Sequence, residues 1–173
     1  MVAAGLLSAI PGTAARAQPE KSEWERHQEE LAWREIETPT PAYPRPENLL
    51  PFYVSAASDF SFFVDTTSIS VGEDGVVRYV LVARSAQGAQ SVSFEGIRCS
   101  TSEYRIYATG VAPGRWAPAR AAWRAIDPRR VARWHNALAK EYFCPSGRPI
   151  RGAAEGVLAL RRGDHPSRAL TGD

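Results

Sequence analysis

Three side chains of this sequence could take part in hydrolytic chemistry. Asp65 closes an aromatic stretch, Glu95 lies inside an alternating stretch, and His135 follows a tryptophan. Carboxylates and imidazoles can transfer protons near neutral pH, so a small envelope hydrolase using Asp65, Glu95 or His135 is one hypothesis. We favour structural roles instead: an Asx turn at Asp65, a buried ion pair at Glu95 and a satisfied buried imidazole at His135. The ion-pair partner of Glu95 would be Arg98, Arg105 or Arg124.

The sequence lacks the spaced motifs of common catalytic and metal centres. It has no GxSxG elbow, P-loop, GxGxxG, HExxH, CxxC or EF-hand loop. The histidines at positions 27, 135 and 165 could share a metal only if three distant regions converged. We therefore expect no metal, no cofactor and no catalytic residue set.

Arginines and tryptophans alternate along residues 115–134. Such side chains together can bind phosphate groups, acidic glycans or a protein partner. The alternative is that the tryptophans are core residues and the arginines form a solvated face. Nucleic acid is disfavoured because the net charge is only +2 and export is expected. The predicted binding residues are Trp116, Arg120, Trp123, Arg124 and Arg130.

The first residues have the features of a secretory signal peptide. An apolar run at residues 2–10 is followed by Ala15 and Ala17, which fit the −3 and −1 positions of a cleavage site after Ala17. No basic residue precedes the run, and a core helix turn is the alternative. The sequence has no run of about 18 apolar residues, so we predict no transmembrane helix. We expect a periplasmic protein, free or associated with the outer membrane.

The chain has two cysteines, Cys99 and Cys144. Neither has a second cysteine or a histidine at metal-binding spacing. In an oxidising compartment they would form a disulfide, whereas in a cytosolic core they would be buried free thiols. Because export is expected, we predict the disulfide.

The 173 residues are sufficient for one folded domain. After a signal peptide at residues 1–17, we expect a helical arm and a proline-rich linker at 18–49. The helical arm would cover residues 20–37, and five prolines follow between residues 38 and 51. A single domain would then span residues 50–162, followed by a flexible tail at 163–173.

Alternating apolar residues and short connections predict an antiparallel meander. The fold class is therefore α+β, with an antiparallel sheet of about five strands and one C-terminal helix packed on it. The helix would begin at Asp127 and carry an apolar stripe that includes Trp134, Leu138 and Tyr142. A Cys99–Cys144 disulfide would tie the helix to the sheet. The strands are expected near residues 60–66, 76–84, 91–99 and 103–109, and Trp116 with residues 123–126 would add a short final strand.

Several short strings carry a family resemblance. EGIRCSTSEYRIYATG at residues 95–110 is the most specific, and FVD at 63–65, GEDGVVRY at 72–79, WR at 123–124 and YFCP at 142–145 accompany it. Together they resemble the cryptic neisserial protein-like family of exported β-proteobacterial proteins. That family has no established activity, so the resemblance implies export and supplies no catalytic residues.

The layout of strands, cysteines and closing helix is also similar to the surface-adhesin E domain. That likeness implies, as a further alternative, an adhesin-like binder of extracellular proteins. The favoured function is a non-catalytic binding or structural module of the bacterial envelope. Its partner would be an envelope protein, a lipid headgroup or an acidic glycan.

Overall fold

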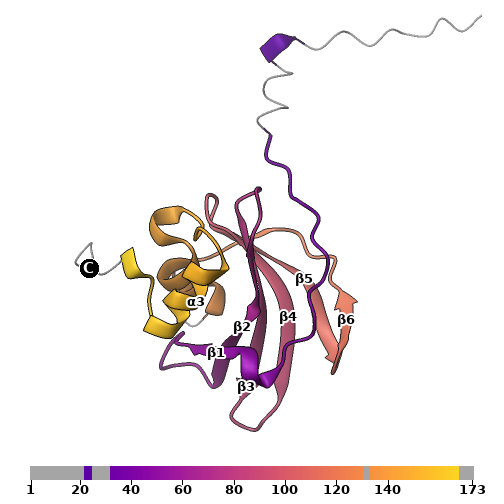
Figure 1. Ribbon diagram of the computed structural model, residues 1–173, viewed down its shortest axis with the longest axis vertical. Helices are drawn as coiled ribbons and strands as arrows, with labels where there is room; N and C mark the ends of the chain where they lie inside the picture. The colour runs from indigo at the N-terminus through magenta and orange to yellow at the C-terminus, as the bar shows by residue number, and fades with distance from the viewer. Residues whose placement is uncertain (1–21, 25–31, 131–132, 168–173) are drawn as a thin grey trace, which may run out of the picture. The chain divides into compact units, whose positions relative to one another are not determined.

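The computed structural model describes residues 22–24, 32–130 and 133–167. The chain divides into two compact units, Met1–Trp33 and Arg34–Asp173, and every labelled element in Figure 1 belongs to the second. The predicted signal peptide and half of the predicted helical arm lie outside the described residues, and residues 23–24 of that arm are helical. Residues 32–37, at the end of that arm, are described and are not helical.

The second unit is built on one antiparallel sheet. Strands β1 to β6 lie in chain order, and β7 pairs with β5. The strands are β1 (Leu49–Phe52), β2 (Phe60–Val71), β3 (Val76–Ser85), β4 (Gln90–Arg98), β5 (Glu103–Ala112), β6 (Arg115–Pro118) and β7 (Arg124–Ala125).

The prediction of about five strands was too low, because seven are present among the described residues. The last predicted strand is in fact two short strands, β6 and β7. The other addition is β1, which contains Pro51 and crosses the predicted boundary between the linker and the domain. Proline is tolerated there because β1 pairs with β2 alone and is an edge strand, so the missing N–H breaks no second ladder.

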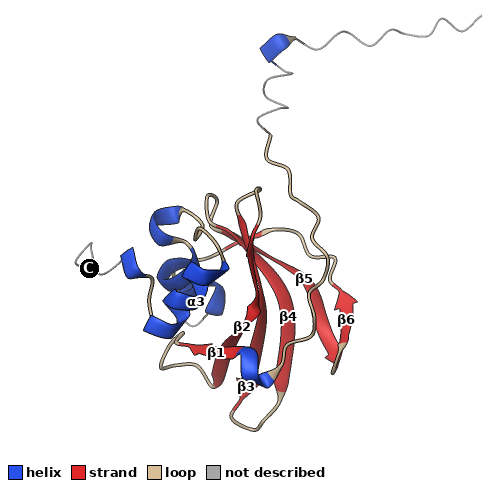
Figure 2. Cartoon of the chain, viewed as in Figure 1, coloured by secondary structure: helices blue, strands red, loops and turns tan. Residues whose placement is uncertain are grey.

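The helices cover one face of the sheet, here called the inner face (Figure 2). Helix α2 (Trp134–Ala137) continues into the π-helical η2 (Leu138–Phe143), and α3 (Ala153–Arg162) follows. Short 3₁₀ turns, η1 (Pro46–Asn48) and η3 (Pro145–Gly147), complete the described elements.

The structure corrects two helix predictions. The helix predicted from Asp127 begins at Trp134, although its apolar stripe does pack on the inner core as expected. The expectation of one C-terminal helix is also wrong, because α3 is a second one. The sequence did not predict α3, because residues 147–163 are rich in glycine and arginine. The buried side of α3 is formed by Gly156, Ala159 and Leu160.

The predicted disulfide between Cys99 and Cys144 is present, with Cα atoms 5.4 Å apart. Cys99 follows the end of β4, and Cys144 follows η2. The bond therefore ties the helical layer to the sheet across 45 residues of chain.

The opposite, outer face of the sheet has its own smaller apolar cluster, which includes Val80, Val82 and Phe94. Residues Val76–Ala83 of β3 are all buried because both faces of the sheet are covered. Part of the outer cover is residues 34–43, called the strap below, which run across this face outside any strand (Figure 1). The proline-rich segment expected as a spacer thus begins inside the compact unit, with Tyr43 against Trp116.

Candidate functional site

A cavity of about 370 Å³ lies between β5, β7 and the start of α2. Asp127 is the one carboxylate in its lining. Asp127 lies 3.7 Å from Arg130 and 3.2 Å from Arg129. Within the described part of the chain, no carboxylate lies at ion-pair distance from Arg124 or Arg133. The lining is therefore net positive, and we call this space the arginine cavity. It is lined by Tyr104, Arg124, Ala125, Ile126, Asp127, Arg130, Arg133 and His135.

His135 joins this cavity to a buried carboxylate beneath it. Its ring stacks on Tyr104 with centroids 3.6 Å apart. Its Nε2 lies 3.0 Å from Oε2 of Glu95, at ion-pair distance but without the alignment of a hydrogen bond. His135 is 4% exposed and Glu95 is fully buried, so only the imidazole contributes to the cavity wall.

Glu95 is held by donors from several directions. Tyr79 Oη donates to Oε2 over 3.0 Å, Trp134 Nε1 donates to Oε2 over 3.1 Å, and Ser93 Oγ donates to Oε1 over 2.6 Å. Burial by itself raises the pKa of Glu95. His135, Ser93 and Trp134 more than offset that effect, so the pKa lies below its ordinary value. The carboxylate is therefore a charged, satisfied part of the core.

The sequence predicted that Glu95 is buried beside an arginine, but the ionisable neighbour is a histidine. None of the three arginines considered contacts it; the partner is His135. The strand register explains this, because Tyr79 faces Glu95 on the inner side while Gly96 pairs with Arg105 on the outer side. Adjacent residues of a strand point to opposite faces.

Asp65 has no part in this group. It is buried, and one carboxylate oxygen accepts hydrogen bonds from the Thr67 backbone N–H and hydroxyl over 2.9 and 2.7 Å. This is the predicted Asx turn. Of the three residues in the hydrolase hypothesis, the structure brings together only Glu95 and His135.

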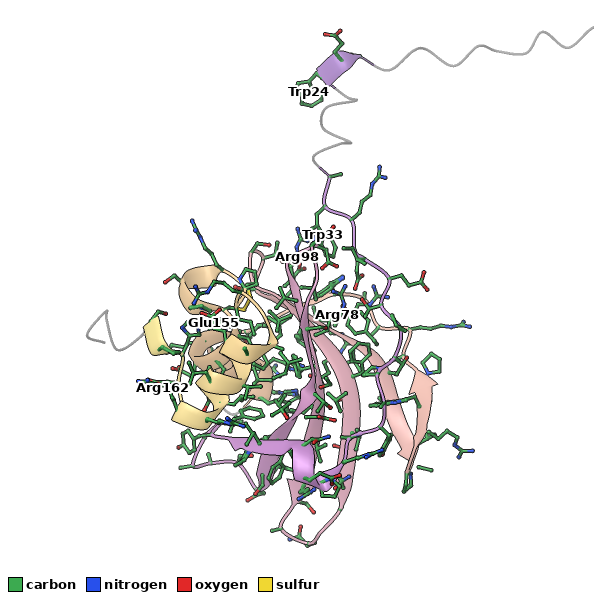
Figure 3. The ribbon with its side chains drawn as sticks, in the orientation of Figure 1. Trp24, Trp33, Arg78, Arg98, Glu155 and Arg162 are labelled. Atoms are coloured by element: carbon green, nitrogen blue, oxygen red, sulfur yellow. A yellow bond between two sulfur atoms is a disulfide. The ribbon has the colours of Figure 1, made fainter. Side chains whose placement is uncertain are left out.

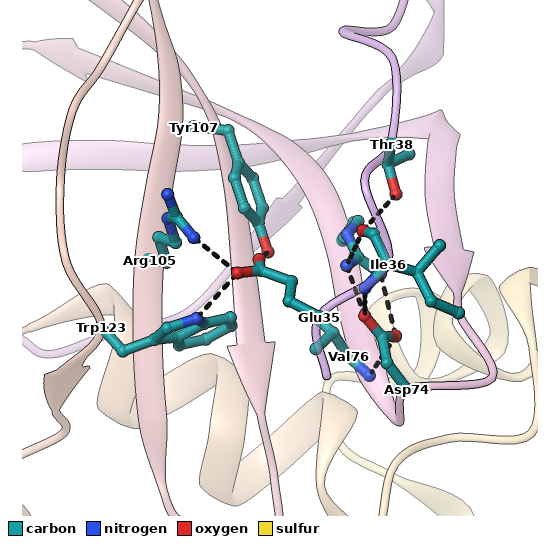
Figure 4. Close-up of polar contacts among 9 residues, drawn as sticks. Glu35, Ile36, Thr38, Asp74, Val76, Arg105, Tyr107 and Trp123 are labelled. Atoms are coloured by element: carbon teal, nitrogen blue, oxygen red, sulfur yellow. Dashed lines mark hydrogen bonds and ion pairs between the residues drawn. The ribbon is translucent and has the colours of Figure 1, made fainter. Parts of the chain in front are cut away.

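A second polar site lies on the outer face, where the strap meets β5 (Figure 4). The Glu35 carboxylate accepts hydrogen bonds from Arg105, from Tyr107 Oη over 2.7 Å and from Trp123 Nε1 over 3.1 Å. Further along the strap, Trp116 Nε1 donates to the Pro41 carbonyl over 3.0 Å. The two predicted binding tryptophans thus hold the strap.

Asp74 and Arg78 form a buried pair on the outer face; Figure 3 labels Arg78, and Figure 4 labels Asp74 and Glu35. Their side chains are 0% and 2% exposed, and Nη2 of Arg78 lies 2.6 Å from Oδ2 of Asp74. The pair also holds the Ile36 backbone: Asp74 accepts its N–H and Arg78 donates to its carbonyl, both over 2.8 Å. Burial raises the pKa of Asp74, but the hydrogen bonds of Arg78 and two backbone N–H groups leave it lowered.

The five predicted binding residues therefore fall into three places. Trp116 and Trp123 contact the strap, and Arg124 and Arg130 line the arginine cavity. Arg120 is exposed and lines neither this cavity nor the one beneath the strap. Sequence reasoning missed Glu35, and no local signal marks it, since its partner Arg105 is 70 residues away.

The architecture is that of a disulfide-linked α+β domain with an antiparallel meander and helices on one face. The model of the CNP1-like family matches residues 28–161, and the chain belongs to this family. The resemblance noted in the sequence is thereby confirmed. Neither a curated protein nor a solved structure matches the chain. Among the described residues, no helix has the length and apolar character needed to cross a membrane.

Proposed function

We propose that this protein is an exported, non-catalytic binding module of the bacterial envelope, and that the arginine cavity binds an anionic group of its partner. The observation that carries this proposal is the unbalanced charge of the lining. Arg124 and Arg133 have no carboxylate partner in the described structure, and Asp127 is shared between Arg129 and Arg130. Guanidinium groups so placed favour phosphate or carboxylate ligands.

The cavity volume of about 370 Å³ suits a small group rather than an extended chain. Tyr104 and His135, whose rings stack on each other, both line this cavity. A phosphate of a lipid headgroup and a carboxylate of an acidic glycan share the negative charge that the arginines of this cavity would recognise.

Binding can be tested on the full disulfide-bonded chain by calorimetric titration with inorganic phosphate and, separately, with galacturonate. We expect saturable binding of at least one, and a loss of about tenfold or more in affinity on the double substitution R124E and R133E. R120E is the matched control, since it reverses an exposed charge outside the cavity. Equal binding by all variants, or no binding of either anion, would overturn the proposal.

Export has its own test. The Cys99–Cys144 bond supports an oxidising compartment, because such bonds are rare in the cytosol. Intact mass of protein recovered from a Gram-negative periplasm should place the first residue at Gln18, and alkylation should occur only after reduction. An uncut chain with free thiols in the cytoplasm would contradict export.

The hydrolase alternative draws on one observation, the Glu95–His135 pair beside a cavity. In this arrangement Glu95 would orient the imidazole as a general base. The lining contains no serine, threonine or cysteine, and in this alternative the nucleophile is a water molecule activated by His135. Release of phosphate or sugar from envelope esters or glycans by the wild type, abolished by H135N, would favour this alternative over binding alone.

A further inference from the structure

The outer face of the sheet holds the strap through its backbone as well as its side chains. The Asp74–Arg78 pair satisfies both the N–H and the carbonyl of Ile36, and Trp116 satisfies the Pro41 carbonyl. These contacts do not depend on which side chains the strap carries. They are the contacts by which a groove holds an extended peptide.

One pocket of this face is selective. Arg105, Tyr107 and Trp123 direct three donors at the Glu35 carboxylate, two of them at the same oxygen. Figure 4 shows the carboxylate between these donors on one side and the Ile36 backbone on the other. A neutral or basic side chain at this position would leave Arg105 without its carboxylate partner.

The groove belongs to the sheet and not to the strap. Arg78 is fixed by Asp74 and lies over the Tyr107 ring, with its guanidinium carbon 5.7 Å from the ring centroid. The groove is also only partly filled, because a cavity of about 360 Å³ remains beside the strap. Nε of Arg78 and of Arg105 are buried there without a hydrogen bond in the described structure.

We propose that this groove is a binding site for an extended acidic peptide of another protein chain, and that the strap occupies it in competition. The ligand would place a glutamate at the Arg105 pocket and its next residue on the Asp74–Arg78 pair. The carbonyl six residues after that glutamate would reach Trp116, as Pro41 does after Glu35. The positive charge of Arg105 complements a glutamate of the peptide. The strap shows that an extended segment with a glutamate fits the groove. The strap is tethered to the groove and therefore competes at an effective concentration of about millimolar. A peptide from another chain must bind tightly enough to displace it.

The test opens the groove without altering it. In the full chain, E35R removes the carboxylate and I36P removes the N–H that Asp74 accepts, while the sheet residues stay intact. The probe is a synthetic peptide with the sequence of residues 34–43, titrated while tryptophan fluorescence is followed. We expect saturable binding by the E35R and I36P double variant, and binding at least about tenfold weaker by the wild type.

Two controls identify the pocket. The same peptide with glutamine at the first glutamate should bind the double variant about tenfold more weakly, because a charge-assisted bond to Arg105 is lost. In a variant that carries E35A and I36P, adding R105E should abolish binding of the acidic peptide and allow binding of one with arginine at that position. The proposal would be overturned by a double variant that has the same melting temperature as the wild type but does not bind the peptide. It would also be overturned by equal binding by wild type and variant, or by equal affinity for the glutamine peptide.

Discussion

Trp123 and Arg124 are neighbours in the chain but belong to different sites on opposite faces of the sheet. Trp123 Nε1 donates to Glu35 beneath the strap, whereas Arg124 lines the cavity that contains His135. Arg124 is part of β7 and pairs with Tyr104, whose ring stacks on His135. Strand alternation therefore divides what the sequence presents as one aromatic and basic patch.

The Glu95 network should be essential for stability. E95Q removes the buried charge that His135, Tyr79 and Trp134 face, and leaves the donors imperfectly satisfied. We expect the free energy of unfolding to fall by about 3 kcal/mol. Urea denaturation followed by tryptophan fluorescence measures it, and E47Q, at an exposed position, is the control. A loss no larger than that of E47Q would show that the network contributes no stability.

The same carboxylate should shape the acid unfolding of the protein. The pKa of Glu95 is lowered in the folded state from its ordinary value of 4.5, so the unfolded chain binds this proton more readily. Its contribution is therefore complete above about pH 4.5 and is lost as the pH falls through the folded pKa. In E95Q the slope of stability against pH below that value should decrease, by at most about 1.4 kcal/mol per pH unit. The pKa values of Asp74 and Glu155 are also lowered in the folded state. These two groups therefore contribute to the slope of stability against pH in both the wild type and E95Q.

Breaking the Asp74–Arg78 pair should be costly. D74N leaves the guanidinium of Arg78 buried without its counter-charge, and we expect a loss of about 3–5 kcal/mol in unfolding free energy. E73Q, at the exposed neighbouring position of the same turn, should change stability by less than about 0.5 kcal/mol. Thermal and urea unfolding of the two variants give the comparison. Similar stability of both would mean that Arg78 finds other partners.

The disulfide should stabilise the fold mainly through the unfolded chain. Replacing Cys99 and Cys144 by serine opens a closed loop of 45 residues, which the chain-entropy account values at about 4 kcal/mol. Equilibrium unfolding of the double variant, compared with the wild type before and after reduction, measures this contribution. The reduced wild type and the double variant should agree closely, and a reduced wild type as stable as the oxidised one would refute the expected role.

Gly110 should control how closely the strap approaches the sheet. A Cβ at this position would lie 2.7 Å from the hydroxyl oxygen of Tyr43 and 3.1 Å from Cβ of Val92. G110A should therefore displace Tyr43 and alter the fluorescence of Trp116. G152A is the matched control, because a Cβ there meets nothing within 4 Å and its φ of 168° is ordinary extended backbone. Unchanged tryptophan fluorescence in G110A would show that Tyr43 does not anchor the strap.

Local patterns in the sequence determined much of the architecture. The apolar run of β3, the alternation of β4 and β5 and the spacing of Trp134, Leu138 and Tyr142 predicted a meander with a helix packed on it. The chain has two cysteines, neither at metal-binding spacing, and this predicted the bond between them. The turn at Asp65 depends on contacts with Thr67, two residues further along the chain. Such features are encoded locally because they depend on side-chain periodicity and on neighbours in the chain.

Only the tertiary structure decided the sites. Glu35 meets Arg105 because a segment far away in the sequence crosses the sheet, and Glu95 meets His135 because α2 packs on the inner face. Register then assigned Arg105 and Glu95 to opposite faces and separated Trp123 from Arg124. These pairings arise from the arrangement of whole strands and helices, which short-range propensity does not specify, and the arrangement places the charges that a partner would meet.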